Sequence, residues 1–208
     1  PVDLGNDIWG SPAVADLEGD GDMEIVIGSK DKHLLIINSD GTIQADYNAH
    51  QYIMATPALG DIDGDGDLEV VFGGYSSPGK LFAVNPDGSA VSGFPIELGE
   101  KIQRGVALAD FSGDGLVDIV VGTDDEMIHV IYGDGTEAPG FPFEADNDFR
   151  TAPSVIELNG EKVIVAGSRD DNFYGINSDG SLRFVVETGA DVSTSAGFGP
   201  TLSGVGIF

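Results

Sequence analysis

The sequence contains no cysteine and few basic residues. Without a thiol among its 208 residues, it excludes a disulfide framework, a cysteine-ligated zinc site and thiol catalysis. Only 9 Lys and Arg stand against 36 Asp and Glu, and the formal net charge is −27 at pH 7. A chain this acidic repels phosphate backbones and anionic lipid surfaces, so we expect no nucleic acid partner. No apolar run approaches the roughly 20 residues that span a bilayer, so we also expect no membrane insertion.

The composition is nevertheless that of a folded protein. Hydrophobic residues make up 41% of the chain, with 11 Phe and 5 Tyr, which is too apolar for intrinsic disorder. The 31 Gly residues are roughly twice the usual share and indicate many turns. The acidity of this globular, turn-rich chain therefore needs a specific explanation.

The chain contains four copies of one repeat. The copies begin near Pro12, Pro57, Val106 and Pro153, at offsets of 45, 49 and 47 residues. Each copy continues with an acidic glycine-rich stretch, two short apolar runs and an Asp-Gly pair. Asp-Gly between apolar runs predicts a β-hairpin, because both residues tolerate a positive φ. Each copy is therefore expected to fold as an antiparallel unit of short strands.

Repeats of this length, with β-branched strands and no helical periodicity, are typical of propeller blades. A parallel β-helix is the alternative, but its rungs are shorter and lack internal Asp-Gly hairpins. We predict an all-β fold, a single β-propeller region built from about four blades of 45–49 residues. The region spans residues 1–208, with repeats at approximately 11–55, 56–104, 105–151 and 152–193 and partial units at 1–10 and 194–208. Because both ends fall inside units, we expect a fragment of a propeller of roughly six to eight blades.

The acidic stretch of the second copy, residues 61–69, reads Asp-Ile-Asp-Gly-Asp-Gly-Asp-Leu-Glu. Oxygen ligands at positions 1, 3 and 5, a glycine at 6, a main-chain carbonyl at 7 and a carboxylate at 9 describe a loop around calcium. So many carboxylates repel one another unless a cation lies among them. A solvated acidic turn is the alternative, and three phased copies favour the metal. Position 12 is Phe72, inside an apolar run, so the loop is not an EF-hand.

The copies differ as candidate metal sites. The second has the best set of ligands, because Glu18 in the first is longer than usual and Ser112 in the third is neutral. The fourth copy is two residues shorter and brings Lys162 near the cation position. We therefore predict no metal in the fourth copy.

The acidic loop, followed by an apolar run that ends in Gly, resembles the FG-GAP/VCBS repeat. Such repeats form the calcium-binding β-propellers of integrin α-subunit heads and of many secreted microbial proteins. The resemblance covers residues 11–184 nearly continuously, and the Asn-x-Asp-Gly turns are closer to the microbial branch. It implies about three Ca²⁺ sites, whose ligands would be Asp16, Glu18, Asp20, Asp22 and Glu24; Asp61, Asp63, Asp65, Asp67 and Glu69; and Asp110, Ser112, Asp114, Leu116 and Asp118.

The resemblance implies a secreted or cell-surface protein. We expect a calcium-stabilised extracellular β-propeller that serves as a binding, adhesion or structural module. Its partner would be a protein or glycan at the cell surface, with self-assembly as a further option. The alternative is the propeller part of a secreted polysaccharide-degrading enzyme, either a lyase or a hydrolase.

Catalysis on an anionic sugar needs convergent basic residues. The three histidines are scattered, and Arg104, Arg150 and Arg169 come from separate loops. These arginines are expected to form surface salt bridges more readily than a catalytic ring. We predict no catalytic residue and favour a non-catalytic module.

Three aromatic residues, Trp9, Tyr52 and Phe149, each precede the first strand of a repeat. They suit either a ring of platforms that stack against sugars or plugs between adjacent blades. Packing between blades is the favoured interpretation.

Overall fold

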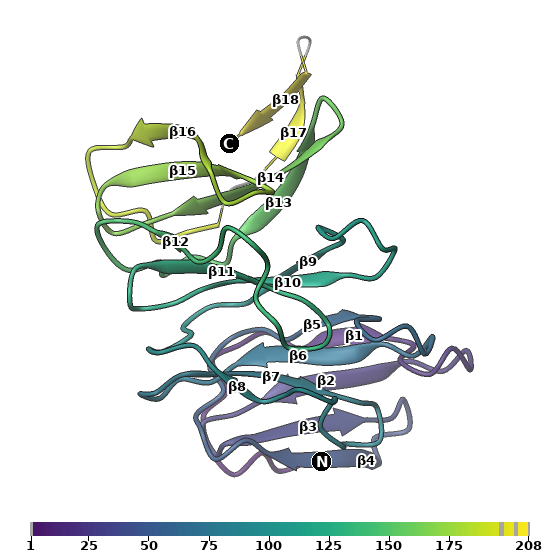
Figure 1. Cartoon of the computed structure of the whole chain (residues 1–208). Helices are drawn as coiled ribbons and strands as arrows, with labels where there is room; N and C mark the ends of the chain where they lie inside the picture. The colour runs from purple at the N-terminus through teal and green to yellow at the C-terminus, as the bar shows by residue number, and fades with distance from the viewer. Residues whose placement is uncertain (1, 196–197, 202–203, 208) are drawn as a thin grey trace.

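A computed structural model describes residues 2–195, 198–201 and 204–207. Four antiparallel four-stranded sheets follow one another along the chain, each with its strands in sequence order (Figure 1). The sheets are β1 (Ala13–Ala15), β2 (Glu24–Gly28), β3 (His33–Ile37) and β4 (Ile43–Asn48); β5 (Ala58–Gly60), β6 (Glu69–Gly73), β7 (Lys80–Val84) and β8 (Ile96–Glu97); β9 (Ala107–Ala109), β10 (Asp118–Gly122), β11 (Met127–Ile131) and β12 (Phe143–Glu144); and β13 (Ser154–Leu158), β14 (Glu161–Gly167), β15 (Asn172–Asn177) and β16 (Leu182–Glu187). A pair, β17 (Phe198–Thr201) and β18 (Gly204–Ile207), follows them.

The described ranges contain strands and turns but no helix, and hence no helix that could cross a membrane. The prediction of an all-β fold with four propeller blades is therefore confirmed.

Hydrophobic cores lie between consecutive sheets. Val26, Leu34 and Ile36 of the first sheet pack against Val70 and Phe72 of the second. The second and third sheets, and the third and fourth, share cores in the same way. Because a central strand such as β6 has a neighbouring sheet on both faces, it is buried along its whole length and is apolar after Glu69, its first residue. The short strands β1, β5, β9 and β13 adjoin one another and form the inner wall of the stack.

Each apolar run ends in glycine because another side chain occupies that space. Ile53, Ile102, Phe149 and Val192 lie against Gly28, Gly73, Gly122 and Gly167, respectively. A Cβ at Gly73 would lie only 2.1 Å from Ile102 Cγ2, so the position accepts no larger residue.

The three aromatic residues noted in the sequence therefore have different roles. Phe149 is buried as an inter-blade plug, as the packing interpretation predicted. Trp9 and Tyr52 are 62% and 42% exposed, so that interpretation is wrong for them. The buried equivalents of Phe149 are the aliphatic residues Ile53 and Ile102, not the aromatic ones.

The Asp-Gly pairs close tight turns between the third and fourth strands of the blades. The aspartate of each pair accepts a hydrogen bond from the backbone N–H two residues later, as Asp134 does from Thr136 at 2.9 Å. The hydroxyl of Thr136 donates to the same Asp134 oxygen, which lowers the pKa of that carboxyl. Hydroxyls at the equivalent positions likewise lower the pKa of Asp40, Asp87 and Asp179.

Candidate metal centre

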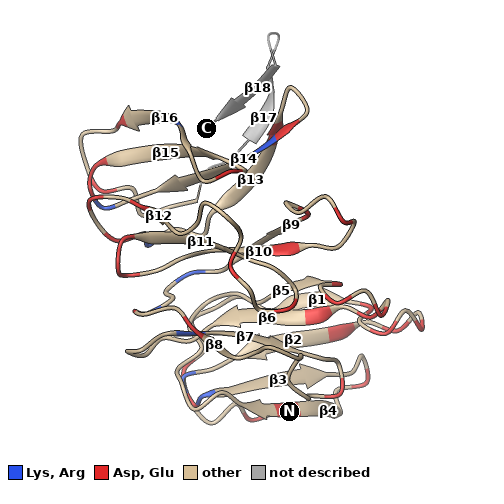
Figure 2. Cartoon of the chain, viewed as in Figure 1, with Lys and Arg blue, Asp and Glu red and all other residues tan. Residues whose placement is uncertain are grey.

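The acidic loops connect β1 to β2, β5 to β6 and β9 to β10, and they project on the same side of the stack (Figure 2). In the second loop both glycines have a positive φ, 84° at Gly64 and 98° at Gly66. This conformation is strained for other residues and lets the chain wrap round its own carboxylates. The loop geometry therefore explains why glycine recurs at these two positions.

The second loop brings three of the predicted ligands together. Carboxylate oxygens of Asp61, Asp63 and Asp65 lie within 4.8 Å of one another. Backbone N–H groups of the loop orient them: Gly64 donates to Asp61 at 2.6 Å, and Asp67 donates to Asp65 at 2.9 Å. This cluster has the oxygen chemistry and the spacing to hold an ion.

Glu69 closes the same loop from β6. Its side chain is fully buried, and Oε2 accepts a hydrogen bond from the Ile62 N–H at 2.8 Å. The other oxygen, Oε1, is buried with no hydrogen-bond partner among the described residues. The pKa of Glu69 is raised to about 7, mainly by burial and in smaller part by the charges of Asp63, Asp65 and Asp61. An unpartnered buried carboxylate oxygen beside a carboxylate cluster fits a site for a cation.

In the first loop, backbone N–H groups of the loop engage both oxygens of its first aspartate. Both oxygens of Asp16 accept loop N–H groups, from Asp20 at 3.0 Å and from Gly21 at 2.9 Å. Glu24 is buried and accepts the Leu17 N–H at 2.9 Å, as Glu69 does in the second loop. Glu18, Asp20 and Asp22 remain exposed. In this conformation the first loop does not form a triad as close as that of the second.

The third loop has the same backbone but a different charge. Asp118 is buried and accepts two N–H groups, from Phe111 at 2.7 Å and from Ser112 at 2.8 Å. Asp110 accepts the Gly113 N–H and Asp114 accepts the Leu116 N–H. The backbone arrangement of the second loop is therefore repeated, with neutral Ser112 and Leu116 in place of Asp63 and Asp67.

Lys162 of β14 reaches the third loop. Its Nζ donates to the main-chain carbonyl of Asp110 and lies 3.8 Å from Asp110 Oδ2. Lys162 belongs to the fourth copy, where residues Asn159 and Gly160 form a two-residue turn with φ of 57° and 82°. The ammonium group thus lies at the neighbouring loop, a contact that depends on how the blades stack.

Neighbouring loops are joined directly. The Leu68 N–H of the second loop donates to the Leu17 carbonyl of the first at 2.7 Å. The Val117 N–H of the third loop donates to the Asp61 carbonyl of the second at 3.4 Å. By strand register Lys162 is the counterpart of Leu68 and Val117, and its side chain makes the corresponding bond to the third loop.

Two of the three arginines noted in the sequence form salt bridges, as expected. Arg150 lies 2.9 Å from Asp148, and Arg169 lies 3.0 Å from Asp191. Arg104 has no ion pair within the described part of the chain. The arginines do not form one ring.

Comparison with known proteins extends these observations. A 94-residue segment, 45% of the chain, is 31% identical to a lambda-carrageenase of Pseudoalteromonas sp, and it spans only 10% of that enzyme. The biofilm matrix protein Bap1 of V. cholerae superposes with a TM-score of 0.65 at 20% identity, over 85% of this chain and 28% of Bap1. BamB from Moraxella catarrhalis superposes with a TM-score of 0.62 at 15% identity, over 91% of this chain and 54% of BamB.

The structural likenesses show the fold, and a family match agrees with the acidic loops. The FG-GAP-like repeat matches residues 16–72 and 61–121, which together cover more than half of the chain. The matched segments begin at the first aspartates of the first two loops and end in the apolar strands that follow the second and third loops. The chain therefore belongs to the FG-GAP-like repeat family.

Proposed function

We propose that the chain is a calcium-stabilised β-propeller module of an extracellular protein and that it serves as a binding surface. The observation that carries the proposal is the second loop, where three converging carboxylates adjoin the unpartnered Oε1 of Glu69. Asp61, Asp63, Asp65 and Glu69 would hold the ion. Bound calcium supplies positive charge that offsets the repulsion among these carboxylates.

An extracellular setting would require only a modest calcium affinity. Calcium sites of extracellular modules bind in the range of about 10⁻⁴–10⁻³ M, which suits the calcium concentration outside cells. The net charge of −27 is also easier to accommodate in a salty medium, where the Debye length is about 8 Å at 0.15 M ionic strength.

Thermal unfolding with and without calcium tests the proposal. Calcium that binds only the folded state stabilises it by about 1.4 kcal/mol at ten times Kd. We expect Tm to rise with calcium in the wild type, and Asp65→Asn to remove most of the part of this rise that comes from the second loop. Glu187→Gln, an exposed residue on β16, removes the same charge outside the loops and serves as the control.

The calcium proposal would be overturned if EDTA left Tm unchanged at low salt. Equal losses in Asp65→Asn and Glu187→Gln would show a general charge effect and would remove the second loop from the proposal.

The similarity to lambda-carrageenase favours a second candidate, the propeller part of a secreted polysaccharide-degrading enzyme. Under this candidate the chain alone would bind a polysaccharide, and cleavage would need further sequence. A reducing-end assay on the chain and on its full-length parent separates the two candidates. Cleavage by the parent alone supports the second candidate, and no cleavage by either supports a binding module without catalysis.

A further inference from the structure

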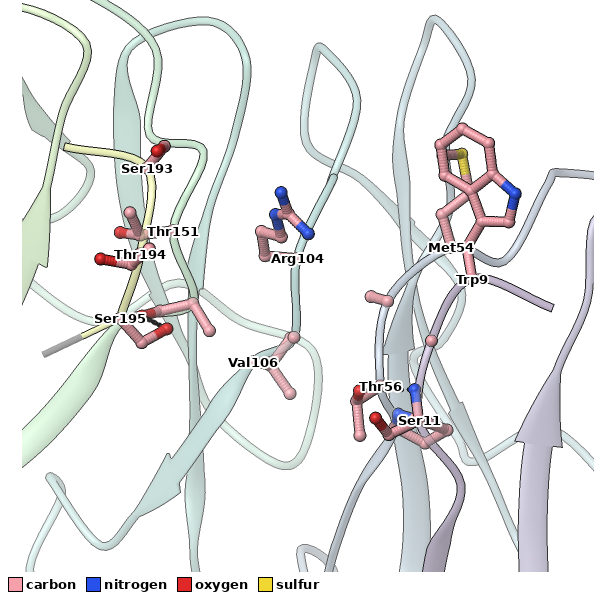
Figure 3. A pocket seen from close by; sticks show the side chains of 15 residues that line it. Trp9, Ser11, Met54, Thr56, Arg104, Val106, Thr151, Ser193, Thr194 and Ser195 are labelled. Carbon is pink, nitrogen blue, oxygen red and sulfur yellow. Dashed lines mark hydrogen bonds between the residues drawn. The ribbon is translucent and has the colours of Figure 1, made fainter. Parts of the chain in front are cut away.

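A cavity of about 580 Å³ lies where the inner strands begin (Figure 3). It is lined by the residues that precede β1, β5, β9 and β13, together with residues 193–195. The acidic loops follow the other ends of β1, β5 and β9. The cavity and the candidate metal centre are therefore at opposite ends of the same three-residue strands, about 10 Å apart.

The cavity differs in charge from the rest of the molecule. The chain has 36 Asp and Glu, yet none of the described residues that line the cavity is acidic. Arg104 is the charged residue of the lining, and it is exposed. Its guanidinium has no hydrogen bond or ion pair within the described ranges, whereas Arg150 and Arg169 are each paired with aspartates. A free guanidinium in a surface without carboxylates is suited to an anionic group, which it binds through two parallel hydrogen bonds.

The remaining lining is rich in hydroxyl groups. Figure 3 shows Arg104 between two walls, with Ser193, Thr194 and Ser195 on one side and Ser11 on the other. All of these hydroxyl residues are exposed. Hydroxyls donate and accept hydrogen bonds, so such walls match a ligand that itself carries many hydroxyl groups.

Trp9 supplies an aromatic surface at the edge of the cavity. The residue is 62% exposed, and the Lys30 amino group lies 4.9 Å from its ring centroid. An exposed indole offers a broad apolar face on which a sugar ring can stack. Lys30 is itself paired with Asp7 at 3.4 Å, so Arg104 remains the unpaired positive charge of the cavity among the described residues. The cavity volume falls within the range of about 300–1,000 Å³ that is typical of small-ligand sites.

We propose that this cavity binds acidic sugar units, with Arg104 binding a sulfate ester or a uronate carboxylate and Trp9 stacking against the sugar ring. The inference rests on the proposed function as a binding module and names its class of ligand. The overall charge of −27 repels long polyanions. Short oligosaccharides at physiological salt are therefore the preferred ligands, because screening confines the electrostatics to the residues of the cavity.

Isothermal titration calorimetry on the calcium-saturated chain tests the proposal. Three oligosaccharides of equal length serve as probes: a sulfated galactan, an oligogalacturonate and an uncharged galactan. We expect at least one acidic probe to bind at least tenfold more tightly than the uncharged one. The sulfated and carboxylated probes distinguish the two sources of negative charge.

Two variants test whether the sugar binds in the cavity. Arg104→Gln should weaken binding of the acidic probe by tenfold or more, and Trp9→Ala by roughly tenfold, as for other exposed anchor residues. Arg183→Gln removes the same charge from β16, where Arg183 pairs with Glu161, and should change the affinity less than twofold.

The proposal fails if the uncharged galactan binds as tightly as the acidic probes, if Arg104→Gln and Arg183→Gln have equal effects, or if an oligoglutamate peptide binds as tightly as the sugars. Absence of all sugar binding, with a calcium-dependent Tm, overturns this inference and leaves the proposed module intact. Sugar binding with a Tm that does not depend on calcium supports this inference and overturns the proposal of calcium stabilisation.

Discussion

Thr136 shows how single hydroxyls tune the turns of this protein. Its Oγ1 lies 2.6 Å from Asp134 Oδ1 and holds the pKa of that carboxyl below its ordinary value. A carboxyl with a lowered pKa in the folded state stabilises the fold when ionised. This contribution is complete above the unfolded value, near 4, and is lost as the pH falls through the folded value.

We expect Thr136→Ala to raise the pKa of Asp134 toward its ordinary value. Carboxyl ¹³C NMR titration measures the change, and Asp40, which keeps Thr42 as its partner, is the internal control. Urea unfolding should show a loss of stability at pH 7 that shrinks as the pH falls below the folded pKa. An unchanged titration of Asp134 would contradict the role of the hydroxyl.

At the scale of the strands and loops, Lys162 of β14 places a positive charge beside the third acidic loop. The Lys162 ammonium lies 3.8 Å from Asp110 Oδ2, and two unit charges at about 4 Å interact by about 1 kcal/mol in water. We therefore expect Lys162→Gln to strengthen calcium binding by the third loop several-fold, as measured by calorimetry. Lys80→Gln is the matched control, because Lys80 pairs with Glu97 in a different sheet. A weaker third site in Lys162→Gln would show that the lysine supports the loop instead of competing with the ion.

The elements differ in how far the sequence predicts them. The strands and Asp-Gly turns follow from local patterns that recur in four copies, and the structure confirms the blades they predict. The second loop also follows from spacing, since Asp61, Asp63 and Asp65 converge. The position of Lys162 does not, because it depends on how one blade stacks on the next.

The sequence carries only a weak signal for the cavity. Ser11, Thr56 and Ser195 occupy the same position in the first, second and partial fifth copies, whereas the third and fourth copies have Gly105 and Ala152 there. The hydroxyl is therefore absent from two of the four full copies, and the repeat pattern alone does not predict the cavity. The sequence also does not distinguish Arg104 from Arg150 and Arg169, because sequence distance does not show which basic residues are paired.

At the scale of the whole molecule, the joints between blades are of two kinds. The first two blades, and the second and third, are linked on the acidic side by loops that calcium would hold, whereas the third and fourth are linked there by Lys162. We expect EDTA to expose the loops at residues 16–24 and 61–69 to limited proteolysis first. The last two blades should persist as the resistant fragment, identified by mass spectrometry. Cleavage at equal rates in all blades would contradict this order.

Lys162 thus acts as a counter-ion that is covalently attached and cannot diffuse away. If calcium occupies the acidic loops as proposed, the joint with Lys162 keeps its positive charge at any calcium concentration, whereas the other two joints would gain and lose theirs with the medium. The link between the third and fourth blades would then be permanent, and the links among the first three blades would be reversible. Its stiffness would be graded along the chain, greatest toward the fourth blade, and would fall from the first blade onward when a source of calcium is lost.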